Sequence, residues 1–460
     1  MRTSTMLIGA TVATALVGAV IARSALQAPA VRALDEKLLR EYAGVYQWDE
    51  DAFVYLQPWS ELTATNQLVA FDESGEVRAL YPTDRDRFFA GPGVAIPGEM
   101  ESQVAFQRDA GGRISSLTWQ RGGAAPRVAR RVEIETREDV RFPSGDVQLA
   151  GTLIRPKADG KYPAIILVHA SGAEDREYVL PLARFLIRYG IAVLGYDKRG
   201  VGGSTGDWNT ASFDDLAGDV VAAFEYLKTR DDIDPKQIGM LGWSQAGWIM
   251  PLAAVRATDM AFLISISGAG VPAAVTTIDQ VQNEMTARGM RPEGIAAIIE
   301  LMKLQYRFAQ TGEGWDEYAA AREKAAARLG GSPPDTFPGT PDDRYWQFIR
   351  RLYFYDPAPT LRQLQTPTLA LFGELDNNIM AEKNRRAWEA PLNAGGNRDY
   401  TLRILPRGNH LLLEANVGSN AEMPSLQRFV PEYFTTVRDW LAKRIRGFGT
   451  SRQEQNTPLR

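Results

Sequence analysis

The stretch GMLGWSQAGWIMP, residues 239–251, decides how the rest of the chain is interpreted. It places Ser244 between an apolar strand-like run and a helix-like run. A strand that ends at Trp243 and a helix that begins at Gln245 require a sharp turn at the serine, which strains its backbone and demands small neighbours. The chain supplies small residues around the serine at Gly242, Ala246 and Gly247. The stretch therefore predicts a turn that lifts the serine hydroxyl clear of a sheet.

Short apolar runs alternate with helical stretches on both sides of this turn. Several runs contain consecutive branched apolar residues, as is typical of strands that are buried on both faces. The expected strands are VQLAGTLIRP, PAIILVHA, IAVLGYD, IGMLGWS, AFLISIS, TPTLALFG and YTLRILP. Between two of them, residues 212–230 begin with Ser212 as a helix N-cap and carry apolar residues along one face. The alternation predicts an α/β fold with a doubly wound, mostly parallel sheet.

An acid and a histidine follow later strands, in the order that a serine nucleophile on such a sheet requires. LALFGELDNNI places Asp376 just after one strand, and LRILPRGNHLL places His410 just after the next. Glu374 stands two residues before the aspartate and is the competing candidate for the acid. The other histidine of the sequence, His169, ends a buried strand, and we expect it to be a hydrogen-bonded structural residue.

Taken together, five stretches make the chain resemble the α/β-hydrolase superfamily over about residues 132–446. They are GWSQAG for the nucleophile turn, GELD for the acid, GNH for the base, VHASG for an oxyanion loop and YDKRGVGGS after the next strand. The last two are similar to the HGSG and YDxRGxGxS stretches of bacterial carboxylesterases and serine aminopeptidase-like hydrolases. The chain departs from these motifs at Ala246 and Ala170, where they have glycine. Asp197 and Arg199 of the last stretch are expected to form an ion pair that fixes their loop.

The chemistry of the three side chains gives each a role. Ser244 attacks a carbonyl carbon, neutral His410 takes its proton and returns it to the leaving group, and Asp376 holds the imidazole in the useful tautomer. The expected reaction is hydrolysis of a carboxylic ester in a small acyl compound, through an acyl-enzyme. An aminopeptidase or amidase, and a thioesterase or acyltransferase, use the same triad and remain alternatives. A non-catalytic binding protein is less favoured, because all three residues are present in order.

Backbone amides are expected to bind the oxyanion of this reaction. One belongs to Gln245, at a helix N-terminus, and for the other we favour Ser171, with Ala170 as the alternative. The mechanism requires no cofactor. The sequence has no cysteine and two histidines, so zinc and iron–sulfur sites lack their usual ligands, and we expect neither a metal nor a cofactor.

The remaining segments divide the chain into further domains. Residues 31–131 alternate in short period-two runs, and NQLVAFDESGEVRALYP and SQVAFQRDAGGRISSLTW each read as a hairpin of a β-rich accessory domain. Its YAGVYQW opening resembles small β-meander modules attached to some serine hydrolases. Residues 271–360 carry helical periodicity and predict a cap inserted between the two core parts, 132–270 and 361–446. Residues 447–460 are expected to form a flexible tail.

Residues 1–30 resemble an export signal. Arg2 precedes an uncharged apolar run over residues 6–22, and small residues follow it. We expect an exported protein, periplasmic or secreted, with the same run as a membrane anchor if it is not cleaved. The net charge of −4 comes from 52 basic and 56 acidic residues mixed along the chain, so nucleic acid is not an expected partner. The oligomeric state cannot be read from the sequence.

Overall fold

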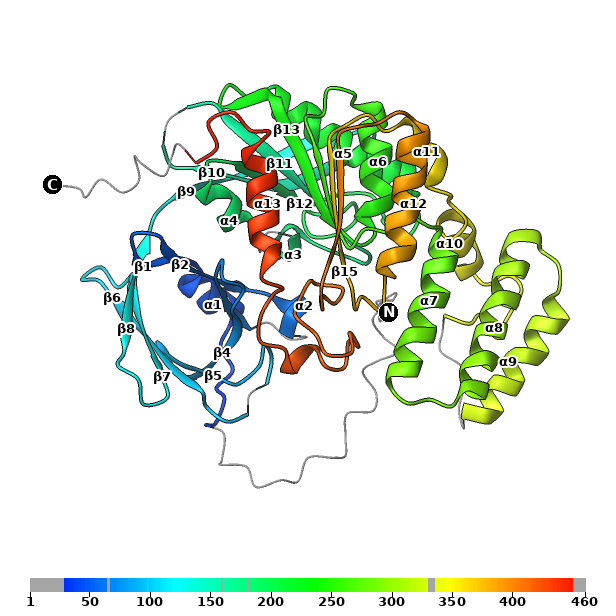
Figure 1. The fold of residues 1–460 in the computed structure, drawn as a ribbon, viewed down its shortest axis with the longest axis horizontal. Coiled ribbons are helices and arrows are strands. Elements are labelled where there is room, and N and C mark those ends of the chain that lie inside the picture. Colours follow the sequence, from blue (N-terminus) through cyan, green and yellow to red (C-terminus); the bar gives the residue numbers. More distant parts are fainter. Residues whose placement is uncertain are drawn as a thin grey trace.

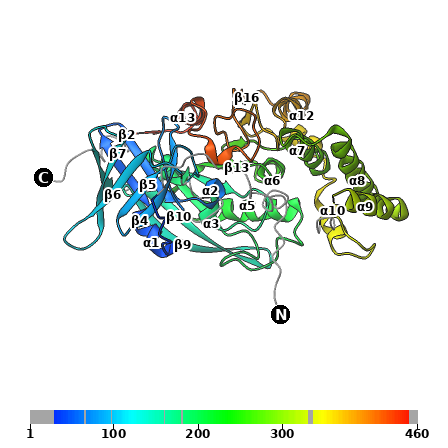
Figure 2. The same cartoon turned by 90° about the horizontal axis from the view of Figure 1, so that it is seen from below.

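A computed structural model describes residues 29–63, 67–96, 98–158, 160–179, 182–329 and 336–449. The segment expected to act as a signal or anchor lies outside these residues, except for positions 29 and 30. Within the described ranges, no helix combines the length and the apolar composition needed to cross a membrane. Three parts follow one another in space, with a barrel at one end, a mixed sheet with helices in the middle and a helical cap at the other end (Figures 1 and 2).

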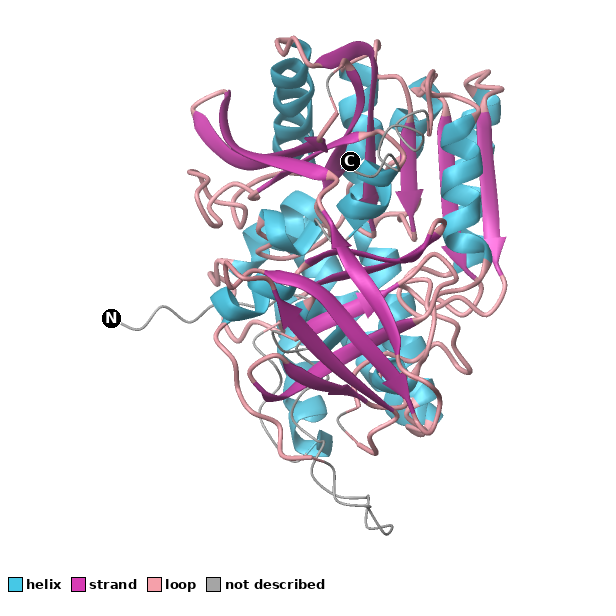
Figure 3. Ribbon diagram, turned by 90° about the vertical axis from the view of Figure 1, so that its left-hand side faces the viewer, coloured by secondary structure: helices cyan, strands magenta, loops and turns pink. Residues whose placement is uncertain are grey.

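The described residues between Gly44 and Val132 form a closed antiparallel barrel of eight strands. Helix α1 (Glu36–Tyr42) precedes the barrel, and α2 (Ser60–Thr63) lies between two of its strands. The two expected hairpins are present as β3–β4 and β6–β7. Figure 3 shows these strands in magenta. Their bounds are β1 Gly44–Asp49, β2 Ala52–Pro58, β3 Leu68–Phe71, β4 Val77–Asp84, β5 Arg87–Ala90, β6 Ser102–Arg108, β7 Ile114–Arg121 and β8 Arg127–Val132.

The second sheet has eight strands within the described residues, in the order β16-β15-β14-β13-β11-β12-β10-β9. Strands β11 to β16 run parallel, and the β9–β10 hairpin joins β12 in antiparallel fashion. All seven strands that the sequence predicts are present, and β9 is an additional one. The bounds are β9 Glu135–Ser144, β10 Val147–Pro156, β11 Tyr162–Val168, β12 Ala192–Tyr196, β13 Ile233–Trp243, β14 Leu263–Ile266, β15 Thr368–Gly373 and β16 Tyr400–Leu405.

Helices cover both faces of this sheet, which confirms the doubly wound architecture. Alternate strand residues point to opposite faces, so Ile166 packs with one group of helices while Ile165 and Leu167 pack with the other. The first face carries α5 (Phe213–Lys228), α6 (Ala246–Arg256), α11 (Ala358–Gln363) and α12 (Ala381–Ala394). The second face carries α4 (Ala183–Arg188) and α13 (Glu432–Ala442), together with the barrel. Short turns of helix complete the core as α3 (Arg176–Val179) and η2 (Met423–Ser425).

A helical cap is inserted between β14 and β15, as the sequence predicts. Its helices pack around their own aromatic core, which includes Trp346, Tyr318 and Phe308. The helices are α7 (Ala273–Ala287), α8 (Pro292–Thr311), α9 (Trp315–Leu329) and α10 (Tyr345–Leu352). The first of them is anchored to the core, because Glu284 accepts hydrogen bonds from the amide of Asn420 at 2.9 Å and from the hydroxyl of Ser419 at 3.1 Å.

Glu73, in the turn between β3 and β4, fastens the barrel to α4. Its carboxylate pairs with the guanidinium of Arg188, which has 5% of its side chain exposed. The same carboxylate accepts from the hydroxyls of Tyr189 at 2.5 Å and Tyr55 at 2.7 Å. Burying a guanidinium is favourable only when an anion and further hydrogen bonds replace the lost water. The barrel and the core are therefore joined by a contact that tolerates little change.

We predict that Glu73→Ala lowers the free energy of unfolding by about 3 kcal/mol, because Arg188 then loses the carboxylate that compensates its burial. The matched control is Asp84→Ala, which breaks the ion pair to Arg32, with both side chains more than 60% exposed. That change should cost less than about 1 kcal/mol. Urea unfolding followed by circular dichroism measures both values. Equal losses in the two variants would contradict a special role for Glu73.

Candidate active site

The turn at Ser244 is as strained as the sequence predicts. Strand β13 ends at Trp243, α6 begins at Ala246, and the serine between them has a φ of 53°. A non-glycine residue rarely adopts this left-handed conformation, which costs about 1–3 kcal/mol and persists only where the surroundings hold it. Hydrogen bonds hold it here, because the amide of Ser244 donates to the carbonyl of Ile266 at 3.0 Å. Its own carbonyl accepts from the amide of Gly247 at 2.9 Å.

Close packing explains why small residues surround the serine. A Cβ atom added at Gly242 would lie 2.5 Å from the Cβ of Ala246 and 2.8 Å from the carbonyl oxygen of Val168. A Cβ added at Gly247 would lie 2.5 Å from the amide nitrogen of Ala269. Real Cβ atoms essentially never come this close, so a larger side chain at either glycine would move the turn. Ala246 itself is fully buried and fits in the place of the family's glycine.

Asp376 and His410 meet at the end of the sheet. The Nδ1 atom of His410 lies 2.9 Å from Oδ2 of Asp376. The other carboxylate oxygen accepts from the amides of Asn378 and Ile379, both at 2.8 Å. The carboxylate is fully buried and the imidazole has 15% of its surface exposed. Because the carboxylate accepts, the facing Nδ1 carries the proton, which leaves Nε2 as the nitrogen that can accept one.

Glu374, the competing acid, lies elsewhere. Its side chain is exposed, and Oε2 accepts from the backbone amide of Arg407 at 2.9 Å. The structure brings Asp376 to His410 and leaves Glu374 on the surface. The buried position of the aspartate follows from the tight loop after β15, where a Cβ at Gly373 would lie 2.3 Å from the carbonyl oxygen of Asn409.

The serine, the acid and the histidine share one edge of the sheet. They follow β13, β15 and β16, which are parallel, and the carboxyl ends of parallel strands meet at the same edge. Ala170 and Ser171 follow β11 at that same edge, next to the end of β13, because Val168 pairs with Gly242. Gln245 stands at the N-cap of α6, one residue after the serine. The order of these residues in the sequence predicts that they lie at one edge of the sheet, and the sheet topology agrees with this prediction.

Residues 165–420 match the sequence pattern of the alpha/beta hydrolase family. The chain belongs to the alpha/beta hydrolase family. Esterase EstD of Thermotoga maritima is 25% identical over 333 residues, which cover 69% of this chain and 70% of that protein. A putative carboxymethylenebutenolidase of a Synechocystis species is 24% identical over 147 residues, or 29% of this chain and 59% of the relative. A solved esterase of Pyrococcus furiosus aligns with 68% of this chain and 92% of its own, at 16% identity and a TM-score of 0.44.

Lys198 is a buried lysine beside the loop that follows β11 in this alpha/beta hydrolase, and the sequence reasoning missed it. Its Nζ donates to the carbonyls of Ala170 at 2.6 Å and Gly172 at 2.7 Å. Burial lowers the pKa of Lys198, and the nearby carboxylate of Glu174 opposes this shift. In a trans peptide the amide points opposite to the carbonyl, so the amide of Ser171 points away from the lysine. The sequence held one signal for this residue, because the lysine in YDKRGVGGS directly follows a predicted buried strand.

The prediction of an ion pair between Asp197 and Arg199 is wrong. Asp197 instead binds Arg176, with Nε at 3.0 Å and Nη2 at 2.9 Å from the two carboxylate oxygens. Arg199 binds Asp219 on α5, at 2.8 Å and 2.7 Å. The chain turns after β12, so the two side chains point to different elements, and each pairs with an oppositely charged residue of the element that it faces. The loop is fixed as expected, but by two ion pairs rather than one.

His169 is a structural residue, in agreement with the sequence analysis. Its side chain is buried, and Nε2 donates to the carbonyl of Tyr196 at 2.6 Å. Its ring meets the ring of Tyr196 edge to face, with centroids 4.6 Å apart. Burial, assisted by the charge of Lys198, lowers the pKa of His169 to about 3. The imidazole is therefore neutral in the folded protein at any pH well above this pKa.

This pKa predicts a contribution to acid sensitivity. An unfolded histidine has a pKa of about 6.5, so between this value and about 3 the unfolded chain binds a proton that folded His169 does not. The free energy of unfolding therefore falls as the pH drops through this window. In His169→Gln, whose amide can still donate to Tyr196, the urea midpoint should fall less steeply between pH 6.5 and 4.5 than in the wild type. Parallel curves for the two proteins would contradict this assignment.

Proposed function

We propose that this alpha/beta hydrolase cleaves carboxylic esters with Ser244 as nucleophile, His410 as general base and Asp376 as the residue that orients the base. The observation that carries the proposal is the strained turn at Ser244, at the same sheet edge as the hydrogen-bonded Asp376–His410 pair. Strain of this kind persists where the surroundings hold it, and at a nucleophile it exposes the hydroxyl. The half-buried state of Ser244 agrees with a hydroxyl that a small substrate can reach.

The reaction then proceeds in two balanced halves. The Ser244 oxygen attacks the ester carbon while Nε2 of His410 takes the hydroxyl proton, and the carbonyl oxygen becomes an oxyanion. The C–O bond to the alcohol breaks as His410 gives that proton to the leaving oxygen. Water attacks the acyl-enzyme in the same way, with its proton passing through His410 to the serine oxygen. Asp376 accepts from Nδ1 throughout and stabilises the imidazolium that forms in each half.

Backbone amides are proposed to stabilise the oxyanion. The amide of Gln245 belongs to the first turn of α6, where helix amides lack intrahelical partners and favour negative charge. The amide of Ser171 is the preferred second donor, because Lys198 binds the carbonyl of Ala170 and so turns this peptide. The amide of Ala170 itself is the alternative. Donors that are already oriented require no reorganisation when the charge develops.

Esters are favoured over amides as substrates. A relative whose alignment covers 69% of the chain is named an esterase. An alcohol is also an easier leaving group than an amine, so an ester needs less help from the general acid than an amide does. A panel of p-nitrophenyl esters with different acyl chains, run against aminoacyl p-nitroanilides, tests the choice. Turnover of the anilides alone would replace this proposal with an amidase or aminopeptidase.

We predict that Ser244→Ala lowers turnover of the preferred ester about a thousandfold or more, since the nucleophile is lost while binding remains. The methyl group fits the space of the hydroxymethyl group, so the fold should be preserved by circular dichroism. A fluorophosphonate probe should label the wild type and not the variant. Equal labelling of both proteins would remove Ser244 from the mechanism.

A second comparison separates the two acids. Asp376→Asn keeps the size of the side chain but can donate to Nδ1, which favours the wrong tautomer, and turnover should fall by about ten-thousandfold. Glu374→Gln alters an exposed carboxylate that binds only a backbone amide, and should leave turnover near the wild-type value. Steady-state kinetics on both variants measure the difference. A larger loss in Glu374→Gln would reverse the assignment.

A further inference from the structure

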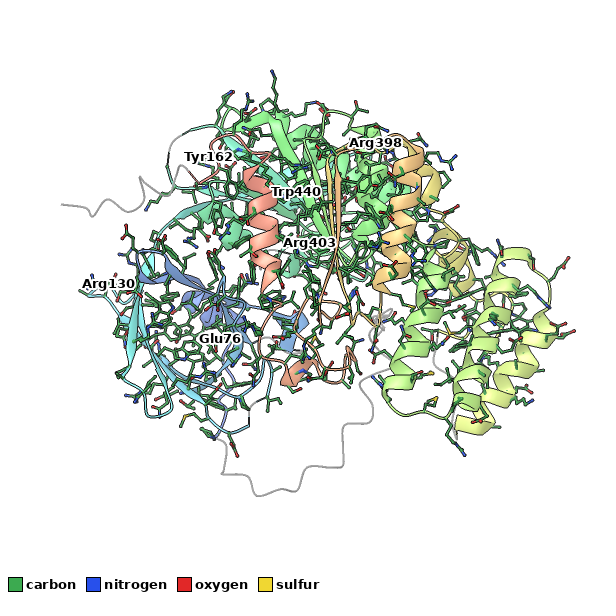
Figure 4. All side chains as sticks on the ribbon, in the orientation of Figure 1. Glu76, Arg130, Tyr162, Arg398, Arg403 and Trp440 are labelled. Atoms are coloured by element: carbon green, nitrogen blue, oxygen red, sulfur yellow. The ribbon has the colours of Figure 1, made fainter. Side chains whose placement is uncertain are left out.

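The stretch that follows the His410 loop lies along the barrel and is bound to it through the backbone. The amide of Phe429 donates to the carbonyl of Gly75 at 2.8 Å, and the amide of Val77 donates to the carbonyl of Gln427 at 3.2 Å. Glu76, labelled in Figure 4, forms an antiparallel bridge with Arg428. Residues 426–429 therefore extend the barrel at its β3–β4 turn like a short added strand.

The same stretch holds the residues just after His410. The amide of Val430 donates to the carbonyl of Leu412, and the amide of Glu414 donates to the carbonyl of Arg428, both at 2.8 Å. Leu413 and Phe429 form a further antiparallel bridge. A continuous set of backbone hydrogen bonds thus leads from the barrel turn, through residues 426–430, to the loop that carries the histidine.

The His410 loop depends on this support because its own backbone is strained. Arg407 and Leu412, on either side of the histidine, both have a φ of 59°. Such residues keep this conformation only where neighbouring structure over-determines it. Inside the loop, the buried side chain of Asn409 accepts from the amides of Leu411 at 3.0 Å and Leu413 at 2.9 Å. Leu412 and Leu413 are thus held from within by Asn409 and from outside by residues 428–430.

Aromatic rings pack across the contact between the barrel, residues 426–430 and α13. Phe429 stacks on Trp59 of the barrel, with ring centroids 6.0 Å apart, and Phe71 of β3 stacks on Phe434 of α13 at 6.1 Å. Phe429 and Phe434 also meet edge to face at 5.4 Å. Three of these four rings are less than 3% exposed, and Trp59 is 8% exposed. The four rings therefore belong to one buried apolar cluster that spans the barrel, residues 426–430 and α13.

We propose that the barrel is a positioning domain for the catalytic base: through the turn at Gly75 and residues 426–430 it sets the place and orientation of His410. The inference rests on the proposed function of His410. Gly75 and Phe429 are positioning residues in this scheme, because they act through the loop and touch no reacting atom. An error of about 1 Å in the place of a base can cost a hundredfold in rate, so a distant support of this kind has a measurable effect.

Gly75 is the position at which this coupling can be tested most directly. Its φ is +93°, and an added Cβ would lie 2.8 Å from the carbonyl oxygen of Phe429, which is backbone and cannot rotate away. Gly112, in the β6–β7 turn of the same barrel, has a φ of +80°. A Cβ atom added there would have no neighbouring atom of the described residues within 4 Å. Asparagine tolerates positive φ better than most residues. Gly75→Asn therefore adds a collision with Phe429 that Gly112→Asn lacks.

The kinetic test uses the full chain and the preferred p-nitrophenyl ester. Gly75→Asn should lower kcat about tenfold or more while KM changes little, because the base moves and the acyl pocket does not. Gly112→Asn should keep the wild-type kcat. Circular dichroism and urea unfolding establish that both variants are folded. An equal loss of kcat in the two variants, or none in either, overturns the proposal.

A spectroscopic test reports on the histidine without any substrate. Because the sequence has two histidines, protein labelled with ¹⁵N-histidine gives two imidazole spectra, and His410→Gln assigns them. Gly75→Asn should shift the Nδ1 proton signal of His410, which is bonded to Asp376, and leave the signal of His169 in place. A His410 signal identical to the wild type in folded Gly75→Asn overturns the proposal. A shifted signal in a protein that cleaves no ester supports positioning and overturns the ester assignment alone.

If Gly75→Asn does not fold, a milder variant tests the same proposal. Arg428 is exposed, and its Nη2 donates to the carbonyl of Ser74 at 3.0 Å, so Arg428→Gln weakens the link at the surface of the same contact. It should lower kcat and shift the His410 signal in the same direction by a smaller amount. If both quantities stay at their wild-type values in folded Arg428→Gln, the barrel does not position the base.

Discussion

A serine held at a φ of 53° imposes conditions on every element around it. The strand before it and the helix after it must approach closely, which Gly242 and Gly247 permit because a Cβ at either would collide with backbone or a neighbouring side chain. The amide of Ser244 donates to the carbonyl of Ile266 and its carbonyl accepts from the amide of Gly247, so the strain of the turn is offset by the packing of β13, β14 and α6. The sheet and the following helix therefore hold the backbone of Ser244 in a conformation that is otherwise unfavourable.

Buried charges fix the loops that surround this turn. Lys198 binds two carbonyls of the loop after β11, Arg176 holds Asp197, and Arg199 holds Asp219. Lys198, Asp197 and Asp219 are buried and the two arginines are half-buried, so moving one loop would leave a buried charge without its partner, at a cost of several kcal/mol. Loops at the carboxyl edge of a sheet are usually its most mobile parts. Here, these ion pairs and hydrogen bonds tie the loops to neighbouring elements.

Local patterns in the sequence were sufficient for most of the core and for the proposed triad. Apolar runs, several of them unalternated, predicted seven strands, and the small residues around Ser244 predicted its strained turn, since both are encoded within about ten residues. The closure of the barrel was not predictable, because β1 pairs with β8 and a hairpin pattern does not say which distant edges meet. The Asp197–Arg199 pair failed because adjacency in a turn does not fix side-chain direction. Lys198 was missed because burial of a charge depends on elements far away in the chain.

The contact between the barrel turn and the stretch after His410 also has a consequence for how the protein is made. Arg78 donates to the carbonyl of Gln427 across 349 positions of the sequence, so the partners of this contact are synthesised near opposite ends of the chain. The strands of the barrel are contiguous in the sequence, but the contact of the barrel with residues 426–430 forms only when nearly all of the polypeptide has left the ribosome. The histidine loop is thus the last part of the site to be supported. The segment that forms the Ser244 turn is therefore synthesised well before the stretch that supports the His410 loop.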